Sequence, residues 1–286
     1  MNLTPSDDQE QLRAATERWL EDNLPIGRPR GQDASAWAQL EDMGWLTVTR
    51  DGLDHGTEAL LFAELGRFLA PVAMISTAVA RRWTSLDGKV ALAVGSRLLD
   101  PEGASGALGL FERAVGHHVI GPIEARPGLD QLTPIADRGD TRPQPVEGKD
   151  AALHLRLLAA AFAVGCAEAA AIMATDYAKL REQFGRPIGA FQAIKHMCVD
   201  MAVRAAVARS QLLFAACALD GGEPDRAFHV AAAKRLADDA ALMSGGAAIQ
   251  VHGGIGMTDE AHPHLTLKRA HLLRFVAPVE TGELLV

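Results

Sequence analysis

The chain has 286 residues, 48% hydrophobic and 22% charged, a composition typical of folded globular proteins and not of disordered or fibrous ones. Its net charge is −8 and it has no long basic cluster, which argues against binding to nucleic acid. The N-terminus is acidic and unlike a signal peptide, and no uninterrupted apolar run reaches the roughly 18 residues of a membrane span. We therefore expect a cytoplasmic protein that does not contact a membrane.

The N-terminal part of the chain has helical apolar spacing. The SDDQ segment at 6–9 has the spacing of a capping box and predicts a first helix over about 6–23. A second helix is expected around 34–43. A third begins near Thr57, and Pro71 is expected to interrupt it.

The middle of the chain changes character. Short apolar runs at Val90–Val94, Leu108–Phe111 and His118–Ile120 alternate with Gly, Pro and Asp, which is typical of a small β region. Residues 127–149 contain four prolines and few apolar side chains. We therefore predict a loose linker for this last segment.

Strong helix signals return in the second half. Residues 151–180 are rich in Ala and Leu, and an apolar stripe predicts a second long helix over about 191–219. A third follows Pro224 and is expected to end before the glycines that start at Gly245. Long helices with short connections favour a helical bundle. The three cysteines in these helices have no CxxC spacing and are expected to be free, buried thiols: Cys166, Cys198 and Cys217.

Two stretches stand out from generic helix: REQFGRPIGAFQ at 181–192 and QVHGGIG at 250–256. Arg181 lies where one long helix gives way to the next, and an Arg side chain offers a planar fork of donors for phosphate oxygens. The glycines of the second stretch let a ligand approach the backbone closely. The spacing is not the GxGxxG of a dinucleotide fold, and both stretches can also be interpreted as simple turns between helices.

These stretches carry a resemblance. The segment YAKLREQFGRPIGAFQAIKHMCVDM is similar to the C-terminal domain of the acyl-CoA dehydrogenase family, and QVHGGIGMTDEAHPHLTLKRA resembles that domain's last glycine turn and following helix. The segment AWAQLEDMGWLTV resembles the family's opening helices. The resemblance implies a mainly α fold with three parts: an N-terminal helical domain (1–84), a reduced β region (85–150) and a C-terminal four-helix bundle (151–286).

The cofactor implied by the resemblance is FAD, bound largely by an adjacent subunit. The family's flavin-contacting positions fall on these residues: Arg181, Phe184, Gln192, Gln250, Gly253 and Gly254. Arg181 would neutralise the pyrophosphate. The alternative is that Arg181 only caps helix carbonyls.

The sequence departs from the family where the catalytic base belongs. The family reaction removes an α-proton from an acyl-CoA thioester, so a carboxylate must lie within hydrogen-bonding reach of the α-carbon. The two usual positions of this Glu correspond to Ala277 and to Leu155, just before Arg156. The remaining candidates for a base are Glu280 and His154.

The family's flavin-contacting motifs of the β domain are also missing from residues 85–150. Together these losses resemble the shortened subunits of heteromeric, often sterol-degrading, acyl-CoA dehydrogenases, in which a full-length subunit completes the site. Two alternatives stay open: a self-sufficient homo-oligomer with an unusual base, and a non-catalytic scaffold of the same fold. No metal site is expected, because four histidines lack a ligand spacing: His252, His262, His264 and His271.

Overall fold

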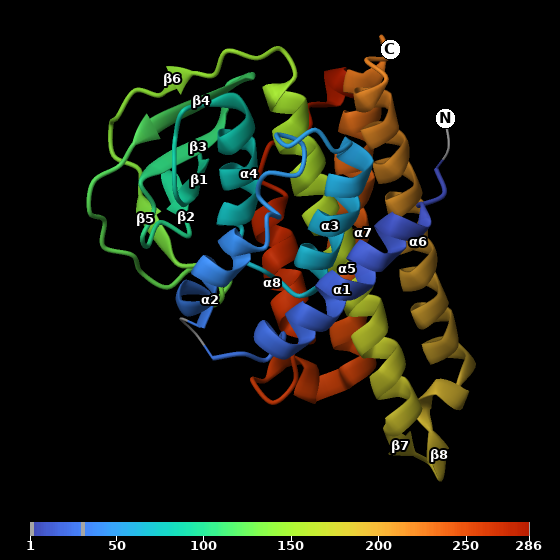
Figure 1. Ribbon diagram of the computed structural model, residues 1–286. Helices are drawn as coiled ribbons and strands as arrows, with labels where there is room; N and C mark the ends of the chain where they lie inside the picture. The colour runs from blue at the N-terminus through green and yellow to red at the C-terminus, as the bar shows by residue number, and fades with distance from the viewer. Residues whose placement is uncertain (1–2, 30–31, 286) are drawn as a thin grey trace.

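The computed structural model describes residues 3–29 and 32–285, with the side chains of 32–35 outside this description. Long helices form an extended bundle, and a small sheet packs against one side of its upper half (Figure 1). The mainly α fold class is confirmed. One hydrophobic core runs from Leu20 through the sheet to Ala277. The boundaries between the three parts remain predictions, because the parts share this core.

Four helices make up the N-terminal part: α1 (Asp7–Asn23), α2 (Gln32–Asp42), α3 (His55–Arg67) and α4 (Ala73–Trp83). The expected capping box is present, since Ser6 Oγ accepts the backbone N–H of Gln9 at 3.2 Å. The expected break at Pro71 separates α3 from α4. Because α3 is buried almost throughout, it belongs to the core of the molecule.

Six of the described strands form a mixed sheet in the order β5-β2-β1-β3-β4-β6. Its members are β1 (Val90–Val94), β2 (Arg97–Leu99), β3 (Gly106–Phe111), β4 (Ala114–Val119), β5 (Ile135–Asp137) and β6 (Gln144–Pro145). Only the β1–β3 pair is parallel. The sheet is covered by α4 on its inner face (Figure 1).

The prediction of a loose linker over 127–149 is wrong in part. The segment contributes β5 and β6, and it buries Asp130 completely. The Asp130 carboxylate accepts a hydrogen bond of 2.5 Å from Nε of Arg269, which is also fully buried and donates to Ala70 O at 2.6 Å. This contact spans 139 residues, so local composition could not reveal it.

The bundle consists of α5 (Ala151–Leu180), α6 (Gln192–Asp220), α7 (Arg226–His252) and α8 (Pro263–Leu273). The prediction that the third long helix ends before Gly245 is wrong, because α7 continues to His252. A Cβ on Gly245 would lie 3.0 Å from Leu267 Cα of α8. Glycine is therefore present for close helix packing at this position and not as a helix stop.

The helices α3 and α5 touch through two glycines. A Cβ at Gly165 would lie 2.0 Å from Ala63 O, and one at Gly66 would lie 2.3 Å from Phe162 O. Cys166 beside this contact is fully buried, and its thiol donates to Gly66 O at 3.6 Å. The backbones of α3 and α5 are therefore in direct contact here, with no space between the two helices.

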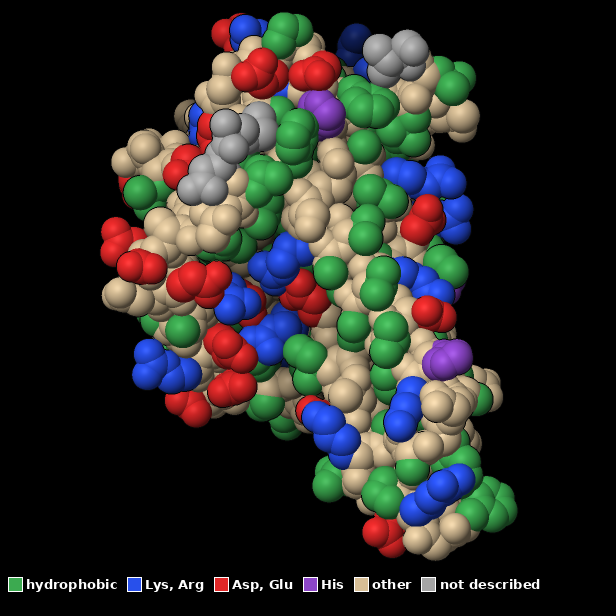
Figure 2. Space-filling view, turned by 90° about the vertical axis from the view of Figure 1, so that its right-hand side faces the viewer, with side chains coloured by type: hydrophobic (Ala, Val, Ile, Leu, Met, Phe, Trp, Pro, Cys, Tyr) green, Lys and Arg blue, Asp and Glu red, His purple; other side chains and the backbone are tan. Residues whose placement is uncertain are grey.

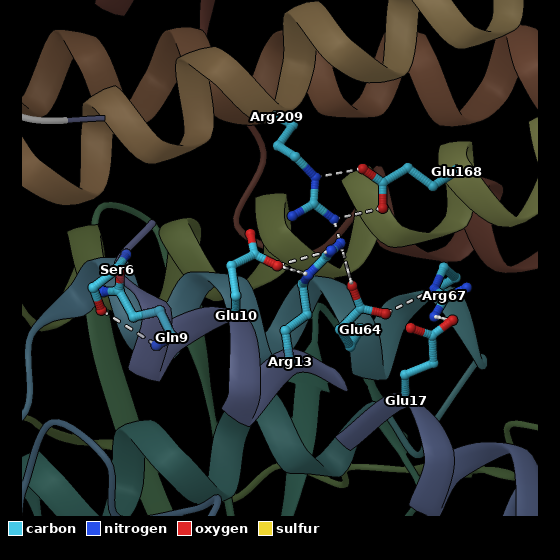
Figure 3. A network of polar contacts seen from close by, with 9 residues as sticks. All are labelled: Ser6, Gln9, Glu10, Arg13, Glu17, Glu64, Arg67, Glu168 and Arg209. Atoms are coloured by element: carbon cyan, nitrogen blue, oxygen red, sulfur yellow. Dashed lines mark hydrogen bonds and ion pairs between the residues drawn. The ribbon is translucent and has the colours of Figure 1, made fainter. Parts of the chain in front are cut away.

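A charged cluster joins α1 to α3, α5 and α6 (Figure 3). At its centre Glu64 is 1% exposed and accepts from Arg67 Nε at 2.7 Å, while Arg209 binds both oxygens of Glu168 at 2.5 and 2.6 Å. Burial raises the pKa of Glu64, although Arg67 and Arg209 oppose this. These ion pairs link α1 to the bundle helices, so the cluster holds α1 against the bundle.

Two bundle helices, α5 and α6, are long and apolar enough to cross a membrane by length and composition alone. In α5, 83% of the apolar window is buried inside the protein, as expected for a core helix. In α6 the figure is 39%, so much of its apolar surface faces outward.

Candidate functional site: a dinucleotide corner

The turn between α5 and α6 forms a corner at the far end of the bundle. It contains a two-residue hairpin, β7 (Glu182–Gln183) and β8 (Arg186–Pro187), followed by the 3₁₀ turn η1 (Ile188–Ala190). The corner stands clear of the rest of the molecule in both views (Figures 1 and 2). Phe184 at its tip is 92% exposed and has a φ of +53°. An exposed aromatic ring on strained backbone is the mark of a contact surface.

A cleft of about 440 Å³ opens beside this corner. Arg181 and Phe184 line it from the corner, while Gly253 and Gly254 line it from the 3₁₀ turn η2 (Gly253–Met257) after α7. The two sequence stretches that stood out therefore meet in space, as the resemblance implied. Their role in binding flavin stays a prediction.

Gln192 and Gln250 do not line this cleft. Gln192 opens α6 and Gln250 lies two residues before the end of α7, and both side chains are exposed. A ligand that extends beyond the cleft could reach them. Their assignment also remains a prediction.

Sequence reasoning missed a pair of rings on the cleft wall. Tyr177 and His252 stack with ring centroids 4.3 Å apart and planes 19° from parallel. One turn separates Tyr177 from Arg181, and His252 lies inside the QVHGGIG stretch, so both were close to the motifs. Only the packing of α5 against α7 brings the rings together.

The cleft fits a dinucleotide in three ways. Among the described residues, no side chain forms a hydrogen bond or ion pair with the Arg181 guanidinium, so its charge is available to an anion. A Cβ at Gly253 or Gly254 would meet nothing within 4 Å, which shows open backbone. Gln183 and His252 also line the cleft, and apolar and aromatic side chains form much of the remaining wall: Tyr177, Ile188, Phe191, Ile194 and Val251.

The two usual positions of the catalytic base are filled by apolar residues. Leu155 is fully buried and Ala277 is 3% exposed. Arg156, next to Leu155, donates to the carbonyls of Ala277 and Pro278 at 3.2 and 3.0 Å. The backbone around Ala277 is therefore tied to α5, and no carboxylate projects from either position.

His154 is buried with both ring nitrogens occupied. Trp83 Nε1 donates to Nδ1 at 3.1 Å, so the ring proton sits on Nε2, which lies 2.6 Å from Glu58 Oε2. This ring cannot accept a proton from a substrate without breaking a buried contact. His154 is thus a poor candidate for a base.

Glu280 is exposed. Its Oε2 is 2.6 Å from Arg113 Nη2, and both side chains are largely in solvent. An exposed carboxylate paired with Arg lacks the environment that tunes a general base. Within residues 3–29 and 32–285, no three His, Cys, Asp or Glu side chains are placed to hold a metal ion.

Comparisons with known proteins agree with this architecture. A family model described as acyl-CoA dehydrogenase, C-terminal domain, matches residues 149–277. The acyl-CoA dehydrogenase IpdE2 of Mycobacterium tuberculosis is 30% identical over 305 residues, covering 94% of this chain and 92% of the relative.

Two solved structures share the fold. The ChsE4-ChsE5 complex of Mycobacterium tuberculosis matches with a TM-score of 0.77 and 21% identity over 99% of this chain and 97% of that chain. The Tcur3481-Tcur3483 steroid ACAD variant matches with a TM-score of 0.79 and 20% identity over 98% of this chain and 96% of that chain.

The helical bundle and the small sheet, together with these comparisons, define a protein of the acyl-CoA dehydrogenase type, a class of flavin-dependent oxidoreductases. The chain belongs to the acyl-CoA dehydrogenase family, as its sequence motifs predicted. FAD is the cofactor of this family.

Proposed function

We propose that this chain is a non-catalytic subunit of a heteromeric, FAD-dependent acyl-CoA dehydrogenase. It presents its dinucleotide corner to a flavin whose ring and catalytic base belong to a full-length partner subunit. The acyl-CoA substrate then binds in the partner. Steroid-derived acyl groups are the first substrates to test, since one structural neighbour is described as a steroid ACAD.

The observation that carries the proposal is the distance between the corner and the chain's own base position, where an apolar side chain replaces the carboxylate. Arg156 and Tyr177 lie on the same helix, α5, so at about 1.5 Å per residue they are roughly 30 Å apart along its axis. No chemical step joins groups so far apart. A corner that binds a dinucleotide therefore serves another centre, which a second subunit must supply.

An exposed apolar stripe on α6 supports a partner subunit. Val199, Val203 and Val207 recur every four residues and are each more than half exposed. Figure 2 faces the α6 side and shows hydrophobic side chains along the length of the extended helical part. A row of exposed apolar side chains along one helix face is typical of a protein–protein contact.

Within this site the chain binds and orients but transfers no hydrogen. FAD, when bound, would accept the hydride that leaves the β-carbon of the acyl thioester. The Arg181 guanidinium neutralises phosphate with paired N–H donors, and the Gly253–Gly254 backbone allows close approach. The proton from the α-carbon goes to the partner, because Leu155 and Ala277 offer no acceptor.

Co-expression with a full-length acyl-CoA dehydrogenase tests the proposal. We expect the chain alone to be colourless and inactive, and the purified complex to carry FAD and to oxidise an acyl-CoA. A chain that is yellow and active on an acyl-CoA by itself overturns it, in favour of a self-sufficient homo-oligomer.

The substitution Arg181→Ala separates this proposal from a scaffold role. Losing a charged hydrogen-bond donor to phosphate costs about 1.5–3 kcal/mol, so FAD should bind the complex at least roughly tenfold more weakly. Arg186→Ala is the matched control, because Arg186 lies on the same hairpin but stacks over Phe191 at 4.3 Å. Unchanged flavin content in Arg181→Ala supports the scaffold alternative.

A further inference from the structure

A strap of residues 120–126 crosses the sheet on the face turned away from α4. It leaves the end of β4 and reaches β5 at the far edge of the strand order, where Arg126 and Ile135 exchange two backbone hydrogen bonds of 2.8 Å. Ile120 and Ile123 of the strap pack against a cluster of mostly small apolar side chains from four strands: Ala91, Ala93, Leu98, Ala107 and Ala136. The alternate β1 residues Val90 and Leu92 join the main core, so this cluster occupies the other, outer face.

His118 of β4 lies on the outer face that the strap crosses. It is the direct antiparallel partner of Ala107, and side chains in such a pair point to the same side. His118 is 5% exposed, both of its ring nitrogens are shielded from solvent, and among the described residues neither nitrogen has a hydrogen-bond partner. Because an imidazole always carries at least one N–H, the closed sheet buries a donor that no described acceptor meets.

The surroundings of His118 oppose its protonation. Burial is the largest cause, and the charges of Arg138 and His117 act in the same direction, so the pKa of His118 lies below its ordinary value. Arg138 follows β5, stacks over the Phe111 ring at 5.0 Å and donates to Gly95 O at 3.1 Å. This guanidinium is therefore fixed near the imidazole.

The other charged side chains around this face are turned to solvent. They are Glu124 and Arg126 of the strap, Asp137 of β5, and Asp140 and Arg142 in the following loop. Arg126 lies 3.5 Å from Asp137. The neighbouring strands β3 and β6 contain no charged residue. An imidazolium at position 118 would thus be a buried cation beside a guanidinium, which costs free energy.

Acid therefore favours an open strap. When the strap leaves the sheet, His118 meets water and regains the ordinary imidazole pKa of about 6.5. The open form then binds a proton that the closed form does not, so the stability of the closed form is lost as the pH falls below that value. Residues 121–125 form no backbone hydrogen bond with the rest of the described chain, so the strap can open without unfolding the sheet.

We propose that the strap 120–126 is an acid-sensitive cover of the outer sheet face and that His118 is its trigger. At neutral pH the strap is closed over the alanine-rich surface. A proton on His118 releases the strap and exposes this apolar surface to solvent. The inference does not rest on the proposed function, because it involves no residue of the dinucleotide corner and no cofactor.

Hydrogen–deuterium exchange of the full chain, read by mass spectrometry, measures opening of the strap. Peptides covering 118–126 are compared at pH 7.5 and pH 5.5, after correction for the chemical exchange rate, with peptides of α5 as the internal reference. His118→Gln removes the titrating group and keeps a polar side chain, and His118→Leu is the second variant in case the first does not fold. His271→Gln is the matched control, since His271 is an exposed histidine. A proton NMR titration of the parent gives the pKa of His118.

We expect the strap of the parent to open up to about tenfold more often at pH 5.5 than at pH 7.5, because one proton separates the two forms over the pH unit below 6.5. Both His118 variants should lose this dependence, and His271→Gln should keep it. The inference is overturned by strap opening that does not change with pH in the parent, or by an unchanged pH dependence in the His118 variants. An equal rise of exchange in α5, or an NMR pKa for His118 at or above the ordinary value, also overturns it.

Discussion

Glu283 near the C-terminus forms a two-point ion pair with Arg156 of α5. Its Oε2 lies 2.6 Å from Arg156 Nη1, and its Oε1 lies 3.2 Å from Nη2. The guanidinium also binds the carbonyls of Ala277 and Pro278. One arginine therefore holds the whole C-terminal segment across the position where the family places its base.

Glu283→Gln should destabilise the fold in a pH-dependent way. Burial alone would raise the pKa of Glu283, but the Glu280 backbone N–H and the Arg156 guanidinium bind the carboxylate and lower the pKa overall. A lowered pKa adds stability that is present above the ordinary Glu value and is lost as the pH falls through the folded-state pKa. The variant should lose about 1 kcal/mol at pH 7, because a partly exposed pair is screened by solvent.

Urea unfolding at pH 7 and at acidic pH measures this effect. The difference between parent and variant should shrink as the pH falls from the ordinary Glu pKa through the lower folded-state pKa, below which the carboxylate is protonated in both states. Glu280→Gln is the matched control, since the Glu280–Arg113 pair is exposed and should add little. Glu280→Gln should also leave the activity of the complex intact; loss of activity would instead favour Glu280 as the base.

Two glycine-to-alanine substitutions should have opposite effects. Gly165→Ala places a Cβ 2.0 Å from Ala63 O in the contact between α3 and α5, so the helices must separate. A destabilisation of roughly 3 kcal/mol or more is expected, as for other overpacked cores. Gly246→Ala, inside α7, meets nothing within 4 Å and should stabilise the helix by about 0.5–1 kcal/mol. If the denaturant midpoints of both variants were higher than that of the parent, or both lower, this packing would be contradicted.

Lys234 and Asp238 form a buried ion pair whose value a double-mutant cycle can measure. Lys234 Nζ lies 2.5 Å from Asp238 Oδ2 and 3.2 Å from Leu273 O, and the lysine is fully buried. Burial lowers the pKa of Lys234 and raises the pKa of Asp238, although the pair's own attraction opposes both shifts.

Lys234→Met should cost about 3–5 kcal/mol of unfolding free energy, because it leaves a buried carboxylate without a cation. The double variant Lys234→Met/Asp238→Leu should recover most of that loss, since a well-packed apolar pair avoids the desolvation penalty. The free energies come from urea unfolding at neutral pH. Additive losses in the double variant would show that the two residues do not act as a pair.

Cys166 should be unreactive in the native chain. Burial raises the pKa of its thiol to about 12, and the side chain is fully buried between α3 and α5. A thiolate is the reactive form, so an aromatic disulfide reagent at pH 8 should modify Cys198 and Cys217 but not Cys166. Cys217 should react more slowly than Cys198, because burial and two nearby carboxylates raise its pKa. Peptide mapping by mass spectrometry identifies the modified thiols. Full denaturation should make the third thiol, that of Cys166, reactive as well.

Several parts of the molecule were predictable from the chain alone because they depend on neighbours in sequence. Apolar spacing and Ala- and Leu-rich composition located the long helices, and the Ser6–Gln9 capping box and the Pro71 break appeared where expected. The glycines at 245–246 led to the wrong prediction that the helix ends before them. A glycine does not by itself end a helix, and Gly245 lies inside α7 where α8 packs directly against it.

The features of the candidate site also fall into two groups, those predictable from the sequence and those that depend on the fold. Short runs of residues carry the family, the cofactor class, the two motif stretches at Arg181 and Gly253 and the apolar residues at both base positions, so these were predictable from the chain. The fold is what stacks Tyr177 on His252, buries Asp130 against Arg269 and ties Arg156 to the backbone of Ala277. Each of these contacts joins segments far apart in the chain, and packing of the core, rather than local propensity, sets which distant side chains meet.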